Sequence, residues 1–302
     1  MSDVQDLEIT DCHHHLWDLQ VNYYPWLTDR ITQRVCGEYS AIRKNYLIED
    51  FLRDMQGLNV VRSVHVQAEH DHTDPVRETR WLQSVADNPV SRGFPHGIVV
   101  YADMTALNVE LILDQHCMNA NVRGVRQMMH EVLLEKSSAP VTHLDDANWR
   151  SNLSLLGKHG LSFDLQVYHT QIRSAYQAVK SCPNVQFVLC HMGQPAQRDA
   201  PYLAAWQAGL RLMASLPNVA IKISGVGMFE RAWSVESLRP LVLGVIEAFG
   251  VQRCLFASNF PVDGMMNSYR RLWDAYSQVT EDFTADERRQ LFSENARRIY
   301  RV

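Results

Sequence analysis

The sequence contains no run of 18 apolar residues, so it has no segment typical of a transmembrane helix. Its first ten residues, MSDVQDLEIT, lack the basic and apolar regions of a secretory signal. The six cysteines form no C-x-x-C pair, which argues against a disulfide framework and indicates reduced thiols. A formal net charge of −5 without any Lys/Arg cluster excludes a nucleic-acid-binding footprint. We therefore expect a cytoplasmic globular protein that binds a small molecule and has no nucleic-acid or membrane partner.

Eight short apolar runs alternate with helix-length amphipathic segments along the 302 residues. This alternation favours an α/β fold, a closed (β/α)₈ TIM barrel, over a doubly wound sheet, whose dinucleotide-binding glycine motif is missing. No linker rich in Pro, Gly or Ser divides the chain, so we predict a single domain over residues 1–302. The expected strands are residues 7–13, 60–67, 96–103, 121–126, 161–167, 185–191, 219–225 and 253–259.

Polar side chains stand at nearly every predicted strand end. The active site of such a barrel lies at the carboxyl ends of the strands, and charged groups buried there must be paired or in use. We therefore expect one site to gather His13, His15, Gln67, Asp103, Arg123, Arg126, Asp164, Gln166, His169, His191, Lys222, Ser224, Asn259 and Asp263.

Three consecutive histidines occupy the stretch DCHHHLWD, residues 11–18. Side chains alternate along a strand, so His13 and His15 are expected to face one way and His14 the other, in a structural role. Two imidazoles on one face can bind a metal ion, at about 2.0–2.1 Å for zinc, or can simply form hydrogen bonds within the barrel. By the same alternation, Cys12 and Cys190 are expected to point away from the neighbouring histidines as core thiols.

Several motifs together resemble a known family. TDCHHHLWD, followed by YYPWL, is similar to the opening of the amidohydrolase-related branch that includes sugar-acid lactonases and other lactone hydrolases. The resemblance implies a distorted (β/α)₈ barrel that opens a lactone or related C–O bond in a small carboxylated intermediate of sugar or aromatic catabolism. It continues in order through VQA (66–68), RGVRQ (123–127), FDLQV (163–167), FVLCHMGQP (187–195), IKISG (221–225) and LFASNFPVD (255–263).

The resemblance also implies roles for the histidines. His13, His15 and His191 match the family's histidine positions and are expected to bind one divalent cation such as Zn²⁺. A bound Zn²⁺ polarises a carbonyl and lowers the pKa of its water to about 7. Without a metal, the same histidines are expected to donate hydrogen bonds to the reacting carbonyl.

Other residues are candidates for binding the substrate. Arg123 or Arg126 can grip a carboxylate through paired hydrogen bonds, and Lys222 can do so as a point charge or stabilise an oxyanion. Trp26, in the first loop, offers an apolar face to a ring. The structural alternatives are buried ion pairs for Arg123 and Lys222 and a packing role for Trp26. Gln67 and Gln166 are the remaining candidates.

Two positions depart from the family pattern. Gln166, with His169 three residues later, stands where the wider superfamily places a histidine ligand. Asn259, in SNFP, stands where an aspartate is common; an amide can orient a water but cannot act as a base. Asp263 is then one candidate base, in which case Asp263→Asn abolishes turnover. A second candidate base is one of the site histidines, acting without a metal. A third alternative is that the protein is no longer a hydrolase.

Two further functions compete with lactone hydrolysis. A non-oxidative decarboxylase of the same family depends on a well-bound metal and the strand-eight aspartate, so Asn259 counts against it. The second is a catalytically silent protein that binds a small molecule, which would raise its melting temperature on binding but form no product. The loops at residues 20–45 and 130–148 are expected to shape the substrate site, and a homo-oligomer is an open possibility.

Overall fold

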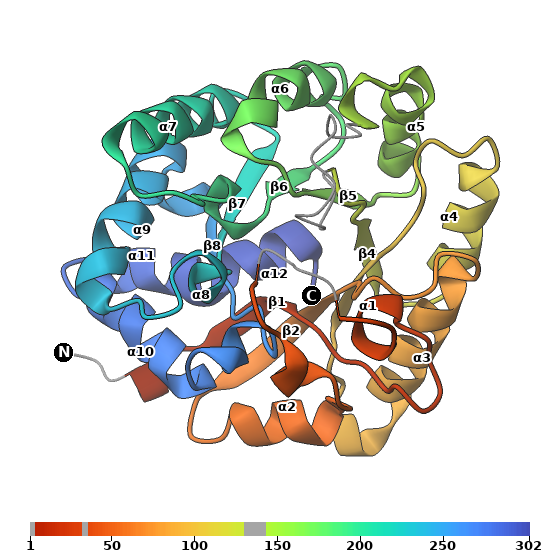
Figure 1. Cartoon of the computed structure of the whole chain (residues 1–302), viewed down its shortest axis with the longest axis horizontal. Helices are drawn as coiled ribbons and strands as arrows, with labels where there is room; N and C mark the ends of the chain where they lie inside the picture. Colours follow the sequence, from red (N-terminus) through yellow and green to blue (C-terminus); the bar gives the residue numbers. More distant parts are fainter. Residues whose placement is uncertain (1–3, 32–35, 130–142) are drawn as a thin grey trace.

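The computed structural model describes residues 4–31, 36–129 and 143–302, so parts of both loops expected to shape the substrate site lie outside the described residues. Eight parallel strands form one sheet in sequence order, which confirms the predicted (β/α)₈ barrel (Figure 1). Seven of the eight strands fall within a predicted apolar run, and β1 extends one residue beyond its run, to His14. The strands are β1 (Ile9–His14), β2 (Val60–Val66), β3 (Gly97–Val100), β4 (Val122–Val125), β5 (Ser162–Leu165), β6 (Phe187–Leu189), β7 (Val219–Ile223) and β8 (Cys254–Phe256).

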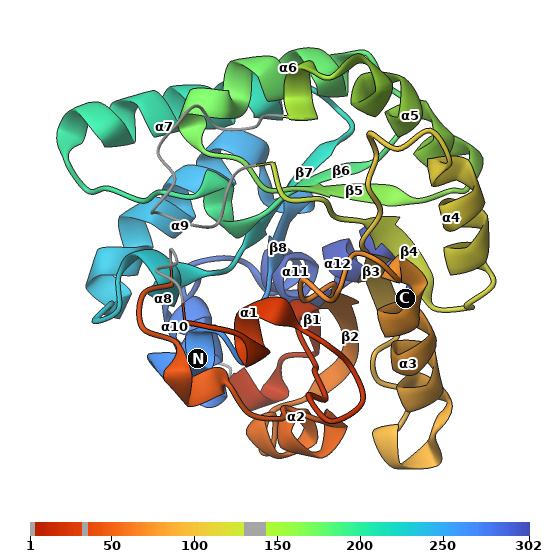
Figure 2. The same cartoon turned by 45° about the vertical axis from the view of Figure 1, so that its right-hand side comes forward.

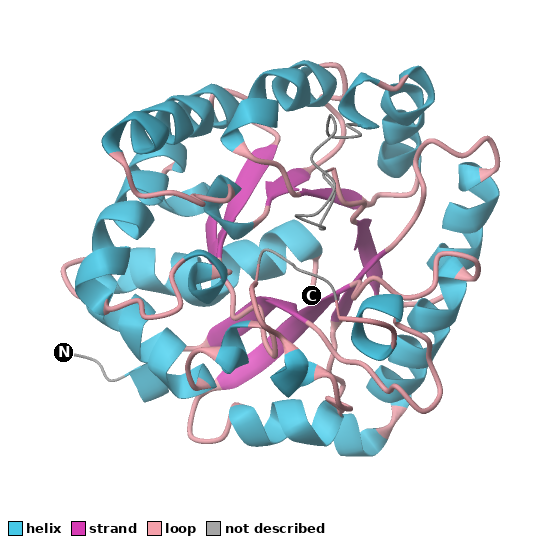
Figure 3. Ribbon diagram, in the orientation of Figure 1, coloured by secondary structure: helices cyan, strands magenta, loops and turns pink. Residues whose placement is uncertain are grey.

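Helices surround the strands, as the ribbon coloured by secondary structure shows (Figure 3). None of the helices in the described parts of the chain is long and apolar enough to cross a membrane. The helices are α1 (Pro25–Thr28), α2 (Ile48–Asp54), α3 (Pro75–Asp87), α4 (Val109–Cys117), α5 (Ala147–Lys158), α6 (Ile172–Lys180), α7 (Ala200–Ala214), α8 (Val226–Phe229), α9 (Val235–Phe249), α10 (Tyr269–Val279), α11 (Ala285–Arg289) and α12 (Asn295–Tyr300).

Hydrogen bonds join the last strand to the first. The Asn259 amide donates to the His13 carbonyl at 2.7 Å, just beyond the end of β8. The buried Asp11 carboxylate accepts from the Ser258 amide at 2.9 Å, from the Ser258 hydroxyl at 2.5 Å and from the Tyr269 hydroxyl at 2.9 Å. A buried carboxylate is costly unless several donors satisfy it, so this network holds β1 against the β8 end.

The amino end of the barrel is closed by α12, which appears through the ring of strands in Figure 1 and beside β3 and β4 in Figure 2. Ile299 and Tyr300 pack inside the barrel with Val64, Val99 and other small apolar residues of the strands. Polar groups of the barrel are therefore shielded from water at this end. The open end is the carboxyl end, where six of the predicted site residues line a pocket.

Cys12 and Cys190 are buried free thiols, which confirms the predicted core position, but the Cys190 thiol lies close to one of the site histidines. Cys12 packs in the inner apolar cluster, and the Cys190 sulfur lies within 4.8 Å of ligand atoms of His13 and Asp164. The pairing of β1 with β2 shifts register between Asp11 and His14, which breaks strict alternation there. His14 does face outward, stacked on Phe51 with ring centroids 4.2 Å apart.

Gly124 allows β4 and β5 to approach closely. A Cβ at this position would lie 2.3 Å from the Ser162 hydroxyl and 3.0 Å from its carbonyl oxygen. We expect Gly124→Ala to lower the free energy of unfolding in urea by about 1–3 kcal/mol, because the strands must move apart. Gly244→Ala, in α9 with no atom closer than 3.8 Å, is the control and should keep or raise stability. Equal stability of the two variants would contradict this account of strand spacing.

Candidate active site

A pocket of about 680 Å³, measured out to the open solvent, lies at the carboxyl ends of the strands. The pocket combines apolar walls with a few polar groups, as small-molecule sites do. Six of the predicted site residues line it: His15, Trp26, Arg126, Gln166, His191 and Asn259. The other described residues of its wall are Cys36, Ala68, Glu69, Met128, Gln194, Met228 and Val262.

His15 presents an unprotonated nitrogen to this pocket. Its Nδ1 lies 2.7 Å from the Val66 carbonyl oxygen, which can only accept, so Nδ1 carries the proton. Burial, together with the nearby Arg126 guanidinium, lowers the pKa of His15 well below its ordinary value. His15 is therefore a neutral imidazole with the lone pair on Nε2, which makes it a proton acceptor.

His13 has the opposite tautomer and lies beneath the pocket. The Lys222 ammonium, which can only donate, is 3.4 Å from His13 Nδ1, so Nδ1 accepts and Nε2 carries the proton. Nε2 is buried and has no hydrogen-bond partner in the described structure. The His13 ring centroid lies 5.1 Å from that of His15 and 4.6 Å from that of His191. The unpartnered proton is therefore available to an acceptor beside these two rings.

Lys222 and Asp164 form a fully buried ion pair, with 2.6 Å between Nζ and Oδ2. Burial alone would lower the pKa of Lys222, but the Asp164 carboxylate outweighs it and holds that pKa above its ordinary value. The second carboxylate oxygen accepts from the Tyr300 hydroxyl at 2.7 Å. The ion-pair alternative for Lys222 therefore describes what the structure shows, and Lys222 does not line the pocket.

His191 is placed by an unusual turn after β6. His191, Met192 and Gln194 all have positive φ angles of 52–56°, which bend the chain across the strand end. The Met192 carbonyl accepts from the Trp206 indole at 2.7 Å, which anchors the turn to α7. His191 Nδ1 lies 2.9 Å from the Ser224 hydroxyl, beyond β7. The ring is thus fixed in the pocket wall between two strands.

Asn259 lines the pocket, whereas Asp263 lies behind it. The Asn259 side-chain amide donates from Nδ2 to Asp263 Oδ1 at 3.2 Å, which leaves its Oδ1 as the acceptor toward the pocket. Burial raises the pKa of Asp263 to about 7, although hydrogen bonds from Asn259 and the Gly227 amide oppose this shift. Asp263 therefore orients Asn259, and its role as a base stays a prediction.

Arg126 and Gln166 are both in the pocket wall, and Gln67 supports them from below. Arg126 donates to Gln166 Oε1 at 3.3 Å and to the carbonyl of Gln67, which is fully buried. The Nε atom of Arg126 is buried without a partner among the described residues. A guanidinium held in this way still has hydrogen-bonding capacity for a ligand.

Arg123 lies outside the site, which corrects its placement among the strand-end residues. It is the second residue of β4, at the amino end of the barrel. Its guanidinium donates to the carbonyls of Arg301, Ala120 and Val122. Arg123 within β4 and Arg126 just beyond it thus lie toward opposite ends of the barrel.

Glu69 is the pocket residue that the sequence analysis missed. It lies three residues beyond β2 with a φ angle of 57°, and its side chain is 25% exposed. Its proximity to Gln67, two residues earlier, was the available signal. Trp26 also lines the pocket and donates from its indole to the Ala68 carbonyl at 2.7 Å, so it has both a packing and a lining position. His169 packs against Tyr202 with ring centroids 4.3 Å apart and does not line the pocket.

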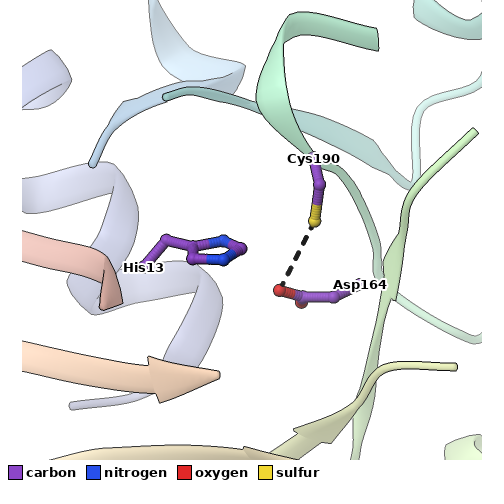
Figure 4. Close-up of side chains that lie close together, drawn as sticks. All are labelled: His13, Asp164 and Cys190. Atoms are coloured by element: carbon purple, nitrogen blue, oxygen red, sulfur yellow. Dashed lines mark hydrogen bonds between the residues drawn. The ribbon is translucent and has the colours of Figure 1, made fainter. Parts of the chain in front are cut away.

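One grouping of potential metal ligands is present in the described chain: His13, Asp164 and Cys190, whose ligand atoms lie within 4.8 Å of one another (Figure 4). It shares only His13 with the predicted set of His13, His15 and His191, which does not form such a grouping among the described residues.

This grouping does not fit a divalent cation as the residues are arranged. The Lys222 ammonium already bonds to Asp164 and lies beside His13 Nδ1, so a second cation there would meet a fixed positive charge. Burial raises the pKa of the Cys190 thiol to about 12, which keeps it protonated. His13 Nε2 carries a proton while Lys222 holds Nδ1. In this arrangement Asp164 is one half of an ion pair, Cys190 is a protonated thiol and His13 is a proton donor, so none of the three is set up as a metal ligand.

The sequence matches the amidohydrolase family model over residues 10–302. The chain belongs to the amidohydrolase family. It is accordingly a hydrolase of that family, with the predicted fold.

Relatives match over nearly the whole chain. The uncharacterized protein y4mH of Sinorhizobium fredii is 44% identical, covering 99% of this chain and 100% of its own length. An L-fucono-1,5-lactonase of Burkholderia multivorans is 25% identical, covering 96% and 95%. A crystal structure of an amidohydrolase from Burkholderia multivorans with bound zinc superimposes with a TM-score of 0.80 at 24% identity, covering 97% of this chain and 99% of that one. This last similarity supports the fold.

Asp263 predicts a pH dependence of stability. Its folded pKa of about 7 exceeds its ordinary value of 3.8, so the folded state holds an extra proton between these values. The contribution of Asp263 to stability therefore declines as pH rises from about 4 to about 7. We expect Asp263→Asn to become more stable relative to wild type by ~2–4 kcal/mol across this window, in urea titrations at several pH values. The exposed Asp282→Asn variant is the control, and parallel curves for Asp263→Asn and wild type would contradict the buried-carboxyl account.

Proposed function

We propose that this amidohydrolase is a lactonase that opens the lactone of a small sugar or aromatic acid. The proposal rests on the opposite tautomers of His15, in the pocket wall, and His13, beneath the pocket with its ring centroid 5.1 Å from that of His15, because one supplies a proton acceptor and the other a proton donor. The relative named as an L-fucono-1,5-lactonase supports this reaction class. Asn259 and Arg126, in the same wall, supply an acceptor and a cation.

In the proposed reaction, His13 Nε2–H donates a hydrogen bond to the lactone carbonyl oxygen. This proton has no other partner in the described structure, and a donor fixed in advance stabilises the negative charge that develops on that oxygen. Lys222 keeps the proton on Nε2 by donating to Nδ1. Lys222 is thus a positioning residue that acts through His13.

His15 Nε2 accepts a proton from the attacking water while Asn259 Oδ1 orients that water. The water oxygen bonds to the carbonyl carbon, the ring C–O bond then breaks, and the leaving alkoxide takes the proton back from His15. The product is a hydroxy acid whose new carboxylate meets the Arg126 guanidinium. The second proton of the water stays on the new carboxyl group and is released to solvent when that group ionises, so one proton is released for each lactone opened.

The first test is a pH-indicator assay against a panel of lactones of sugar and aromatic acids. We expect proton release on one class, and we expect the rate to remain within about twofold after exhaustive chelation, since no step passes through a metal. Loss of activity on chelation with recovery on adding zinc would contradict the metal-free mechanism.

The same panel separates the competing functions. Silence across all lactones would contradict the lactonase proposal. A thermal shift without product would then indicate a binder, and release of carbon dioxide from aromatic carboxylic acids would indicate a decarboxylase.

A second test addresses Lys222 through the double variant Lys222→Met, Asp164→Asn, which leaves no unpaired buried charge. We expect kcat to fall about 10²-fold with KM within about threefold, because the His13 proton is no longer held on Nε2. The surface pair Lys158→Met, Glu110→Gln, at 3.4 Å in wild type, is the matched control. An unchanged kcat in a folded double variant would rule out the positioning role.

A further inference from the structure

Glu69 places a carboxylate in the pocket wall at a position fixed by its backbone. Its φ angle of 57° is uncommon for a residue with a side chain, and such conformations persist where the surroundings hold them. Three quarters of the side chain is buried, and the remainder faces the pocket that His15, Arg126 and Asn259 also line.

Gln67 clamps Glu69 from both sides. The Gln67 amide donates from Nε2 to Glu69 Oε1 at 2.6 Å, and Gln67 Oε1 accepts from the Glu69 backbone amide at 2.7 Å. Gln67 is fully buried, and its own backbone carbonyl accepts from Arg126. One residue therefore fixes both a carboxylate and a guanidinium at the pocket.

The Glu69 carboxylate is held by an amide, so its negative charge is not neutralised by this clamp. The imidazole of His72 lies 3.7 Å from Oε2, but its side chain is 46% exposed on the outer surface. Among the described residues of the pocket wall, Glu69 is the one carboxylate and Arg126 the one guanidinium or ammonium. The wall therefore carries one positive and one negative charge.

We propose that Glu69 determines specificity by accepting a hydrogen bond from a hydroxyl group of the lactone. A carboxylate accepts and cannot donate, so it favours a ligand that offers hydroxyl groups. It also repels a carboxylate placed beside it, so this side of the pocket favours a hydroxyl group over an acidic group, while Arg126 remains for the carboxylate that the reaction forms. This inference rests on the proposed function, and it assigns Glu69 to substrate choice and not to the proton transfers.

The test measures binding without turnover, by calorimetry with polyhydroxylated δ-lactams, which mimic lactones but resist hydrolysis. A set of monodeoxy counterparts identifies the hydroxyl that contacts Glu69. We expect Glu69→Gln to weaken binding of the full lactam by about 10- to 100-fold, as for the loss of a charged hydrogen bond. For the one monodeoxy lactam that lacks the hydroxyl bound by Glu69, Glu69→Gln should change the affinity less than threefold, because that contact is already absent. Glu69→Asp, which keeps the charge, should show an intermediate loss, and Glu110→Gln on α4 is the control.

Each outcome decides a different point. The comparison uses variants whose thermal unfolding matches that of wild type. If Glu69→Gln weakens the binding of every lactam equally, or weakens none, the specificity role is overturned. A fall in kcat for every lactone with unchanged lactam binding would instead place Glu69 in the chemistry and also overturn it. If binding depends on the hydroxyl but the protein opens no lactone, the proposed lactonase function is contradicted and the binding role of Glu69 still holds.

Discussion

The buried ion pair between Lys222 and Asp164 constrains the whole interior of the barrel. Two charges removed from water are tolerated only when each meets a close partner, and here the partners come from β7 and β5. Tyr300, on the last helix, donates to the same carboxylate, and His13 on β1 receives the ammonium. A change in the register of either strand would leave a charge unpaired. The pair therefore fixes the floor on which the pocket is built.

The chemistry of the pocket follows from this floor. Burial keeps His13 and His15 neutral, so their reactivity depends on which nitrogen carries the proton. The ammonium decides this for His13 and a backbone carbonyl of β2 decides it for His15. Asn259 suits a site built from neutral histidines, because its side-chain amide is polar but carries no charge. The amide is held by Asp263, whose pKa is raised by burial.

The sequence predicted the strands well because each buried strand is a short apolar run: seven of the eight strands lie within their runs, and β1 ends one residue beyond its run. It also predicted that histidines from the first and sixth strands meet in space. Side-chain directions were harder to predict. The pairing of β1 shifts register between Asp11 and His14, the positive φ angles after β6 direct His191 into the pocket wall, and Arg123 lies near the start of its strand rather than at its end. Glu69 was missed because it follows the strand end by three residues, where alternation no longer applies.

The network around Asp11 has a consequence for how the protein folds. Asp11 and Ser258 are 247 positions apart in the sequence, and Asp11 and Tyr269 are 258 apart. Contacts of such long range form only after large loops have closed, which makes folding slow. The pocket depends on this long-range closure, because the histidines of β1 and the amide of Asn259 share this seam. A partly folded intermediate can contain most of the barrel's secondary structure and still have no place for a substrate.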